Sequence, residues 1–435
     1  MLRVSFFTLG CKVNQYETQV LSRLFAGEGF LCVGEGEDAE VCVINSCTVT
    51  AQGDRKTRQL LRRLRRERPH AVLALCGCYP QAFPEDAAAL TEADVITGSR
   101  CRAGLVEAVM GFLATGERRV SIVPHRQGEG FEAMSGDEDD SKTRAFIKIE
   151  DGCENFCAYC IIPYARGPVR SKPLEELRRE VTESAAEGRR EVVLAGINLG
   201  SYGRDLGARL ADAVELCCGV EGIERVRLGS VEPDLLTHED IRRLGALPKL
   251  CPQFHLSLQS GCDSVLARMR RRYTTAQYFA LVEELRRYFP DAAITTDMMV
   301  GFPAETDEEA AQSLAFAEKI GFAKIHAFAY SPRSGTPAAA MAEQVTSQNK
   351  KQRIDALLRT GEALRQKFLS GLVGTTQRVL FEGGAHQGMQ CGHAENHTPV
   401  SVCEAEVLQG KIIPVLITEV TKDGCFGIVE KGLAD

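Results

Sequence analysis

The sequence has no long apolar run. No stretch of about 18 apolar residues occurs in the 435-residue chain, so no membrane-spanning helix is expected. The run LRVSFF after Met1 is too short for a signal peptide, and we therefore expect a cytoplasmic protein without a membrane partner. An excess of positive charge is missing as well, since the formal net charge is −7. The chain has no global field that attracts nucleic acid, and any RNA site must be a local patch.

Cysteine, in contrast, is abundant, with 17 residues in the chain. A reducing compartment argues against a disulfide framework. Metal ligands, catalytic thiols and small buried side chains remain as explanations. Hydrophobic residues make up 44% and charged residues 26%, as in a soluble globular protein, and the length allows two or three domains.

The first part of the chain alternates strand-like apolar runs with helical stretches. Strands are expected at residues 2–9, 41–45, 71–76 and 94–97. The helical spacers between them predict a parallel α/β sheet domain over residues 1–125. Residues 126–143 are acidic and aperiodic, and we interpret them as a linker.

Six more strand-like runs follow, at 145–149, 191–195, 225–230, 254–258, 293–300 and 325–330. Six βα units predict a partial (β/α)6 barrel over residues 144–371, ending in a helix at roughly 347–371. Thr306, with Glu309 three residues later, is a capping signature for one of its helices. Short β runs after Gly374 predict a small β-barrel over residues 372–435.

Three cysteines, Cys153, Cys157 and Cys160, form a C-x3-C-x2-C array just after the first strand of the predicted barrel. A structural zinc site needs four protein ligands, and no fourth has suitable spacing nearby. On a [4Fe–4S] cluster, three cysteines leave one iron open for chemistry. Because residues at the carboxyl end of a barrel strand are typically catalytic, we predict catalytic cluster ligands, with Tyr159 as an aromatic face beside the open iron. Incidental buried thiols, or a zinc site completed from afar, are the alternatives.

A second set of three cysteines is spread over the first domain. Cys11, Cys47 and Cys78 each follow a predicted strand closely. The carboxyl ends of parallel strands share one edge of a sheet, so these thiols could meet and hold a second cluster with an open iron. Cys76 competes with Cys78, but it lies within a strand and should point into the core. Three incidental thiols remain the alternative.

The motifs around both sets resemble those of the radical S-adenosylmethionine methylthiotransferase family. They are TLGCKVNQYETQ (8–19), INSCTVTAQGDRKTRQ (44–59), GCYPQ (77–81), FIKIEDGCENFCAYCIIPYARG (146–167), HLSLQSGCDSVLARMRRRYT (255–274), TDMMVGFPAETDEE (296–309) and YSPRSGTPAA (330–339). The resemblance implies S-adenosylmethionine and two [4Fe–4S] clusters as cofactors. One cluster cleaves S-adenosylmethionine to a 5′-deoxyadenosyl radical, and the auxiliary cluster receives sulfur and a methyl group.

Four further residues are candidates for contacts with S-adenosylmethionine. The resemblance implies that Gly196, in LAGIN, approaches its methionine moiety with backbone atoms. Glu232, Ser257 and Gln259 also lie at predicted strand ends. An ordinary role as polar strand-end residues is the alternative for these three.

The opening GCKVNQYE resembles the subgroup that acts on N6-threonylcarbamoyladenosine next to the tRNA anticodon. Isopentenyladenosine in tRNA and ribosomal protein S12 are alternative targets. A zinc-stabilised RNA-binding protein is the alternative that is not an enzyme. The resemblance implies a tRNA substrate, an electron donor such as flavodoxin or ferredoxin, and a sulfur donor.

Basic residues gather in two places. Residues 55–69 predict a helix with eight basic residues and one acid, whose basic surface includes Arg55, Arg58, Arg62, Arg65 and Arg66. Contacts with phosphates are expected there, and a solvated helix face is the alternative.

The second basic group is RMRRRY (268–273), with Arg268, Arg270, Arg271 and Arg272 beside Tyr273. Arginine next to an aromatic ring suits a base presented out of its stack, with an ordinary barrel helix as the alternative. The C-terminal β module resembles the TRAM domain, a small RNA-binding barrel. His255 alternates with apolar neighbours, and we expect a hydrogen-bonded core histidine there.

Overall fold

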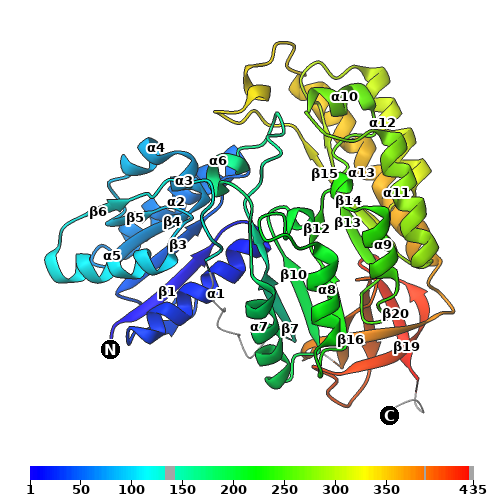
Figure 1. Cartoon of the computed structure of the whole chain (residues 1–435), viewed down its shortest axis with the longest axis horizontal. Helices are drawn as coiled ribbons and strands as arrows, with labels where there is room; N and C mark the ends of the chain where they lie inside the picture. The colour runs from blue at the N-terminus through cyan, green and yellow to red at the C-terminus, as the bar shows by residue number, and fades with distance from the viewer. Residues whose placement is uncertain (133–142, 387, 431–435) are drawn as a thin grey trace.

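The computed structural model of the chain describes residues 1–132, 143–386 and 388–430 (Figure 1). Residues 133–142 of the expected linker and 431–435 of the expected last domain lie outside the described residues. The described residues 126–132 contain no helix or strand, and Glu129 among them pairs with Arg100 and Arg170. The domain boundaries at residues 125, 143 and 371 stay predictions.

The N-terminal part is a six-stranded parallel sheet in the order β2-β1-β3-β4-β5-β6. Its strands are β1 (Arg3–Thr8), β2 (Leu31–Val33), β3 (Val41–Ser46), β4 (Val72–Gly77), β5 (Val95–Thr97) and β6 (Arg119–Ser121). The apolar runs predict four of these strands. They miss β2 and β6, which are three-residue edge strands with partly or fully exposed residues.

Helices cover both faces of this sheet. α1 (Lys12–Gly27) and α5 (Arg102–Thr115) pack on one face, and α2 (Ala51–Glu67), α3 (Cys78–Ala82) and α4 (Pro84–Ala88) lie on the other. Alternate residues of β3 are buried in different cores: Val41 and Val43 pack on the α1 side, and Cys42 and Ile44 pack on the α2 side. Strands buried on both faces are continuously apolar, which is why their sequence is easy to recognise.

The middle of the chain is a curved parallel sheet in two segments, β11-β10-β7 and β12-β13-β14-β15. The strands are β7 (Arg144–Lys148), β10 (Glu191–Ala195), β11 (Arg225–Leu228), β12 (Ser230–Val231), β13 (Gln253–Leu256), β14 (Ala293–Val300) and β15 (Lys324–Ala329). The single strand expected at 225–230 is divided at Gly229 into β11 and β12. Within the described ranges β7 and β15 do not pair, so the (β/α)6 barrel is open, as predicted.

An outer layer of helices packs against this sheet and buries one large apolar core. The helices are α7 (Leu174–Ala186), α8 (Leu210–Gly219), α9 (His238–Gly245), α10 (Asp263–Arg268), α11 (Thr275–Tyr288), α12 (Asp307–Ile320) and α13 (Ser347–Ser370). The predicted capping box of α12 is confirmed: the Thr306 side chain accepts from the Glu309 N–H, and the Glu309 carboxylate accepts from the Thr306 N–H. No helix among the described residues is long and apolar enough to cross a bilayer.

The last part is a closed five-stranded barrel in the order β16-β17-β18-β20-β19. Its strands are β16 (Thr376–His386), β17 (Met389–Ala394), β18 (Pro399–Cys403), β19 (Ile412–Val420) and β20 (Cys425–Val429). Arg225 and Arg227 hold it against the larger barrel by donating to the carbonyls of Arg378 and Glu395, at 2.7 and 2.8 Å. The small barrel thereby closes the amino-terminal end of the larger one.

Candidate functional site

One cavity of about 1080 Å³ connects all three parts of the chain. All six cysteines singled out in the sequence line it, and so do Tyr159, Gly196, Glu232, Ser257 and Gln259. Within the described ranges, no three Cys, His, Asp or Glu side chains already converge on the position of a single metal ion. Convergence on one point is not expected for a [4Fe–4S] cluster, because each cysteine binds a different iron.

Cys11, Cys47 and Cys78 lie at the carboxyl edge of the N-terminal sheet, after the adjacent strands β1, β3 and β4. The loops that carry Cys11 and Cys47 touch closely at Gly10. This residue has φ +106°, and a Cβ atom added there would lie 2.5 Å from the Cβ of Cys47. Only glycine permits this approach, so the sequence Gly10-Cys11 brings two thiols of different strands together.

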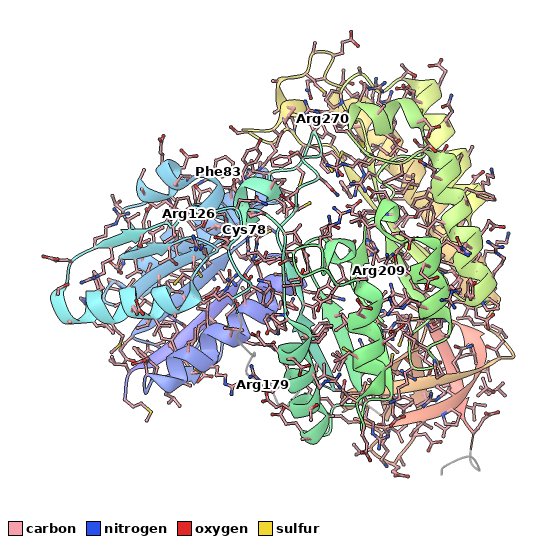
Figure 2. All side chains as sticks on the ribbon, viewed as in Figure 1. Cys78, Phe83, Arg126, Arg179, Arg209 and Arg270 are labelled. Atoms are coloured by element: carbon pink, nitrogen blue, oxygen red, sulfur yellow. The ribbon has the colours of Figure 1, made fainter. Side chains whose placement is uncertain are left out.

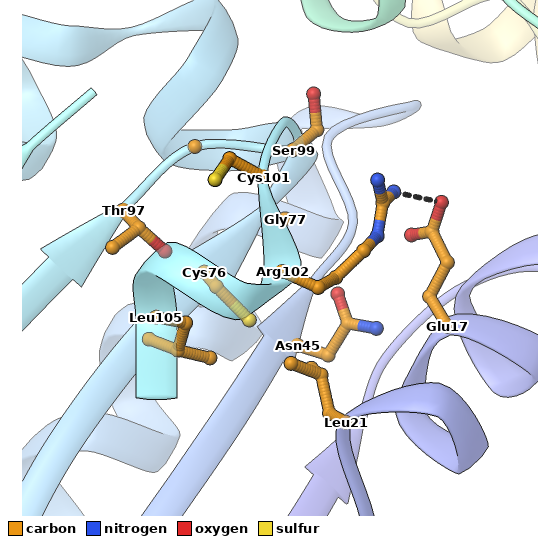
Figure 3. Close-up of a pocket in the computed structure, with 11 residues that line it drawn as sticks. Glu17, Leu21, Asn45, Cys76, Gly77, Thr97, Ser99, Cys101, Arg102 and Leu105 are labelled. Carbon is orange, nitrogen blue, oxygen red and sulfur yellow. Dashed lines mark hydrogen bonds and ion pairs between the residues drawn. The ribbon is translucent and has the colours of Figure 1, made fainter. Parts of the chain in front are cut away.

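Cys76 faces away from these thiols. It lies within β4 and lines a small separate pocket with Leu21, Asn45 and Leu105 (Figure 3). Burial raises the pKa of its thiol to about 12. The strand position thus puts Cys76 in the core and leaves Cys78 at the cavity, which is the arrangement expected from the alternation of a strand.

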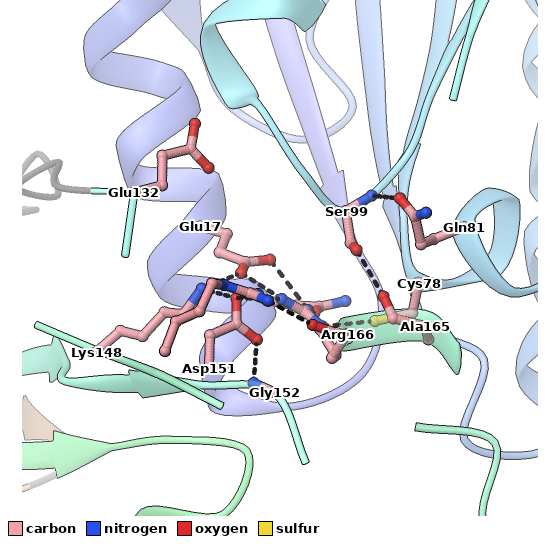
Figure 4. A network of polar contacts seen from close by, with 12 residues as sticks. Glu17, Cys78, Gln81, Ser99, Glu132, Lys148, Asp151, Gly152, Ala165 and Arg166 are labelled. Atoms are coloured by element: carbon pink, nitrogen blue, oxygen red, sulfur yellow. Dashed lines mark hydrogen bonds and ion pairs between the residues drawn. The ribbon is translucent and has the colours of Figure 1, made fainter. Parts of the chain in front are cut away.

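Arg166 lies next to Cys78, at the centre of a network of polar contacts (Figure 4). This fully buried side chain, at the end of α6 (Ile162–Arg166), donates from Nε to Cys78 Sγ at 3.1 Å and from Nη2 to Asn14 Oδ1 at 2.6 Å. It also bonds to Glu17. Burial acts to raise the pKa of Glu17, but Arg102, Arg166 and Lys148 outweigh it and bring that pKa to about 2.

These contacts explain most of the polar residues in CKVNQYE. Asn14 and Glu17 accept hydrogen bonds from Arg166 of the barrel domain, and the Tyr16 hydroxyl donates to Glu180 at 2.9 Å. Sequence reasoning missed Asn14, Glu17 and Arg166 as site residues. Their partners lie about 150 residues away, and the only local signal is a lone arginine after the apolar stretch IIPYA.

Cys153, Cys157 and Cys160 lie on the loop between β8 (Glu150–Asp151) and α6. Their thiols contact side chains from other loops: Asn198 Nδ2 is 3.8 Å from Cys153 Sγ, and Arg271 Nη1 is 3.4 Å from Cys157 Sγ. Burial raises the pKa of Cys153 to about 12, which favours the protonated thiol. A metal bound to this thiol would displace its proton.

Glu150 is a buried carboxyl beside Gly196 and Asn198. Its Oε2 accepts from the Asn198 N–H at 2.7 Å, and a Cβ atom at position 196 would lie 2.7 Å from the same oxygen. Burial raises the pKa of Glu150 to about 8. Three buried oxygens, Glu150 Oε1, Asn198 Oδ1 and Gln259 Oε1, have no protein partner in the described residues, as expected where a polar ligand binds.

Arg271, one of the expected RNA contacts, lines the cavity beside Tyr159. Its side chain is 3% exposed and bonds to Glu232, to the Ser257 carbonyl at 2.8 Å and to the Tyr159 hydroxyl at 3.5 Å. The left-handed turn at Arg270, with φ +59°, sends the next side chain inward. Burial raises the pKa of Glu232 although Arg271 opposes it. Arg271 is therefore a neighbour of Cys157 at the cavity, and its contact with a flipped base stays a prediction.

The other expected RNA contacts fall into two groups. Arg55, Arg62 and Arg66 on α2, and Arg270 on its loop (Figure 2), are exposed. Arg58 is partly buried and donates to the Tyr79 hydroxyl at 3.3 Å, and Arg268 is held by Glu309 at 2.6 Å.

Arg65 differs from its neighbours on α2. Its guanidinium is used inside the domain, where it bonds to Asp94 and to the Ala71 carbonyl. It does not belong to the basic surface predicted for this helix.

His255 also lies in a different place from the one expected. It is hydrogen-bonded, with Nδ1 3.0 Å from the Thr295 hydroxyl, but it lines the cavity and not the core. Strand β13 faces the core with Phe254 and Leu256 and the cavity with His255. In an open barrel the inward side of a strand borders a ligand cavity, whereas a closed small barrel fills it with side chains.

Comparison with known proteins first defines the class. Residues 147–317 match the Radical SAM superfamily, residues 3–98 match the uncharacterized protein family UPF0004, and residues 372–429 match the TRAM domain. A radical S-adenosylmethionine methyltransferase, TsrM of Kitasatospora setae, has a similar fold, with a TM-score of 0.56 at 14% identity over 90% of this chain and 77% of that one. The chain is thus a radical S-adenosylmethionine enzyme, and its cofactors are S-adenosylmethionine and [4Fe–4S] clusters.

Closer relatives define the family. The chain is 36% identical to the threonylcarbamoyladenosine tRNA methylthiotransferase MtaB of Thermotoga maritima, over 91% of this chain and 90% of the relative. The Bacillus subtilis MtaB is 35% identical over 96% and 94%. A tRNA-2-methylthio-N(6)-dimethylallyladenosine synthase of Pelotomaculum thermopropionicum is 34% identical over 96% and 95%. The chain belongs to the methylthiotransferase family.

Proposed function

We propose that this enzyme adds a methylthio group to C2 of N6-threonylcarbamoyladenosine in tRNA. The observation that carries the proposal is that two sets of three cysteines, from two domains, line a single cavity. One set suffices to generate a radical, whereas insertion of sulfur needs a second place to hold the group that is transferred. The MtaB relatives at about 35% identity over most of the chain support the same substrate.

Each set of three cysteines would hold one of the two clusters. Cys153, Cys157 and Cys160 would hold the cluster that binds S-adenosylmethionine, and Cys11, Cys47 and Cys78 would hold the auxiliary cluster. When bound, these groups supply radical and sulfur chemistry that acid–base side chains cannot provide. The chain contributes three thiolates for each cluster, buried surroundings that exclude water, and cations near each set: Arg271 beside Cys157 and Arg166 beside Cys78.

Several residues would bind S-adenosylmethionine. Gly196 permits close approach of a ligand to the backbone, and Glu232, Ser257 and Gln259 line the same wall of the cavity. Tyr159 is held by Arg271 at the edge of the site. Glu150, next to Gly196, offers an unpaired carboxylate oxygen to an ammonium group.

The tRNA would reach the cavity across α2 and the small β-barrel. Arg55 and Arg62 offer exposed cations for phosphates on the N-terminal side, with Arg58 behind them, and Arg270 does so on the barrel side. Arg268, occupied by Glu309, is a weaker candidate. The TRAM-like barrel adds its β17–β18 turn to the cavity wall.

A reductant and a sulfur source complete the proposal. Reduction of the clusters requires a one-electron donor, for which a flavodoxin or a ferredoxin is suitable, and a separate sulfur donor must reload the auxiliary site. We propose the cytoplasm as the location of this reaction.

Nucleoside analysis of tRNA tests the function. A strain lacking this enzyme should accumulate N6-threonylcarbamoyladenosine without its 2-methylthio form, and the gene should restore it. A loss of methylthio-isopentenyladenosine instead, or of the modification on ribosomal protein S12, would contradict the substrate assignment. Colourless, zinc-loaded protein after anaerobic purification would favour a non-enzymatic RNA-binding role.

A further inference from the structure

The inward face of strands β13, β14 and β15 is polar. His255, Thr295 and Lys324 are adjacent in register across the three strands, and Asp297 lies opposite His326 in the next row. All five line the cavity. Packed barrels of this kind carry branched apolar residues at such positions. A row of polar side chains therefore points to a polar ligand.

The charged side chains on this face differ in whether they have a partner. The Asp297 carboxylate lies 3.4 Å from His255 Nε2. The His326 ring contacts the His255 ring at a centroid distance of 5.6 Å. Lys324, in contrast, makes no hydrogen bond or ion pair within the part of the chain that the structure describes, and it is exposed to the cavity. The face thus offers one free cation, next to a histidine.

The position of Lys324 suits contact with the N6 substituent of a modified purine. His255, in the same row, precedes Ser257 by two residues, and the Ser257 carbonyl accepts from Arg271, whose Nη1 lies 3.4 Å from Cys157 Sγ. The row therefore lies beside the part of the cavity that leads to the cysteines. A base whose C2 faces the cysteines has its N6 substituent elsewhere in the same cavity. Lys324 and His326 lie in the part left for that substituent.

We propose that Lys324, assisted by His326, binds the carboxylate of the threonylcarbamoyl group and so selects this nucleoside. The inference rests on the proposed function. A dimethylallyl group in the same place would leave the ammonium group desolvated without a partner, which is unfavourable. Selection would therefore come from attraction of one substituent and rejection of the other. The dimethylallyladenosine synthases are nearly as similar in sequence to this chain as the MtaB relatives, so discrimination must reside in a few such residues.

The test compares two substrates and three enzymes. The substrates are full-length tRNA with N6-threonylcarbamoyladenosine and the same tRNA with the threonyl carboxylate as a methyl ester. The enzymes, all reconstituted with iron and sulfide, are the wild type, Lys324→Met, and Lys351→Met as a matched control. Lys351 is an exposed lysine paired only with Asp355 on α13. Methylthiolation is measured as kcat/KM, and S-adenosylmethionine cleavage reports on the integrity of the radical site.

With the wild type we expect the ester to react about 10- to 100-fold less efficiently than the acid, the loss typical of a charged hydrogen bond. Lys324→Met should lose a similar factor on the acid and almost none on the ester, and it should keep S-adenosylmethionine cleavage. Lys351→Met should behave as wild type. His326→Asn should show a smaller version of the Lys324 effect.

Three results would overturn the inference. One is a wild type that treats acid and ester alike, a result that does not depend on the folding of any variant. A second is an equal loss for Lys324→Met on both substrates, because this is the result expected if Lys324 binds a tRNA phosphate. A third is a Lys351→Met defect equal to that of Lys324→Met. A wild type that methylthiolates neither substrate contradicts the proposed function itself, whereas equal use of both contradicts only the role of Lys324.

Discussion

Replacement of Gly10 by alanine should remove the auxiliary cluster and spare the other one. A Cβ atom at this position would lie 2.5 Å from Cys47 Cβ and 2.8 Å from Cys47 Sγ, so the Cys47 thiol must move. The backbone, with φ +106°, adds strain of about 1–3 kcal/mol. Gly29 is the matched control, since it has φ +83° in the same domain but no atom within 4 Å of an added Cβ.

The assay measures iron content, cleavage of S-adenosylmethionine and formation of the methylthio product. It compares wild type, Gly10→Ala and Gly29→Ala. Wild type should bind about eight irons, two clusters of four. Gly10→Ala should bind about four, cleave S-adenosylmethionine at a nearly normal rate and form no methylthio product. Gly29→Ala should lose a similar amount of stability and keep both clusters. Full iron content and full methylthiolation in Gly10→Ala would refute the idea that this contact sets the position of Cys47.

Three further results are expected. Cys157→Ala should abolish cleavage of S-adenosylmethionine, whereas Cys47→Ala should retain cleavage and lose sulfur insertion; loss of cleavage in a folded Cys47→Ala protein argues against separate roles. Arg333→Met leaves the buried carboxylate of Asp54 without its arginine partner and should lower the free energy of unfolding in urea by about 3–5 kcal/mol. An unchanged urea midpoint would show that this ion pair does not contribute to stability. Burial acts to raise the pKa of Glu191, but Arg227 and Arg144 outweigh it and hold this pKa at about 2, below the usual 4.5. The ionised carboxylate should therefore stabilise the folded protein by about 3 kcal/mol above pH 4.5, and this stability should be lost as the pH falls toward 2. Glu191→Gln should remove this pH dependence.

Local patterns predict the architecture well where burial is two-sided. The expected strand at 191–195 coincides with β10, since a continuous apolar run between helices has few other solutions. The expected strand at 293–300 coincides with β14, although its Thr295 and Asp297 line the cavity. The same reasoning misses β2, β6 and β17. The first two are short exposed edges, and β17, with the sequence MQCGHA, has no apolar run.

The surroundings of the cysteines were not predictable to the same degree. Strand ends show where Cys11, Cys47 and Cys78 lie, because topology alone brings the carboxyl ends of parallel strands together. The partners of the thiols come from elsewhere in the chain: Arg166 reaches Cys78 across 88 residues, and Arg271 reaches Cys157 across 114. No periodicity records contacts over such separations.

Clusters of charge in the sequence do not show which arginine side chains are exposed. In the run RMRRRY the Arg271 side chain is buried between two exposed arginines, Arg270 and Arg272, because a left-handed turn at Arg270 separates their directions. Lys324 gave no signal in the sequence, where it is a single lysine at the start of a strand. Only the register of β13, β14 and β15 shows that it shares a cavity wall with His255.

The most direct test of the two-cluster arrangement is Mössbauer spectroscopy of iron-57 protein in which Cys153, Cys157 and Cys160 are all replaced by alanine. The arrangement predicts one intact [4Fe–4S] cluster of about four irons in this variant, and its loss when Cys78 is also replaced but not when Cys76 is. A folded triple variant without any cluster, or one whose cluster depends on Cys76, would contradict it.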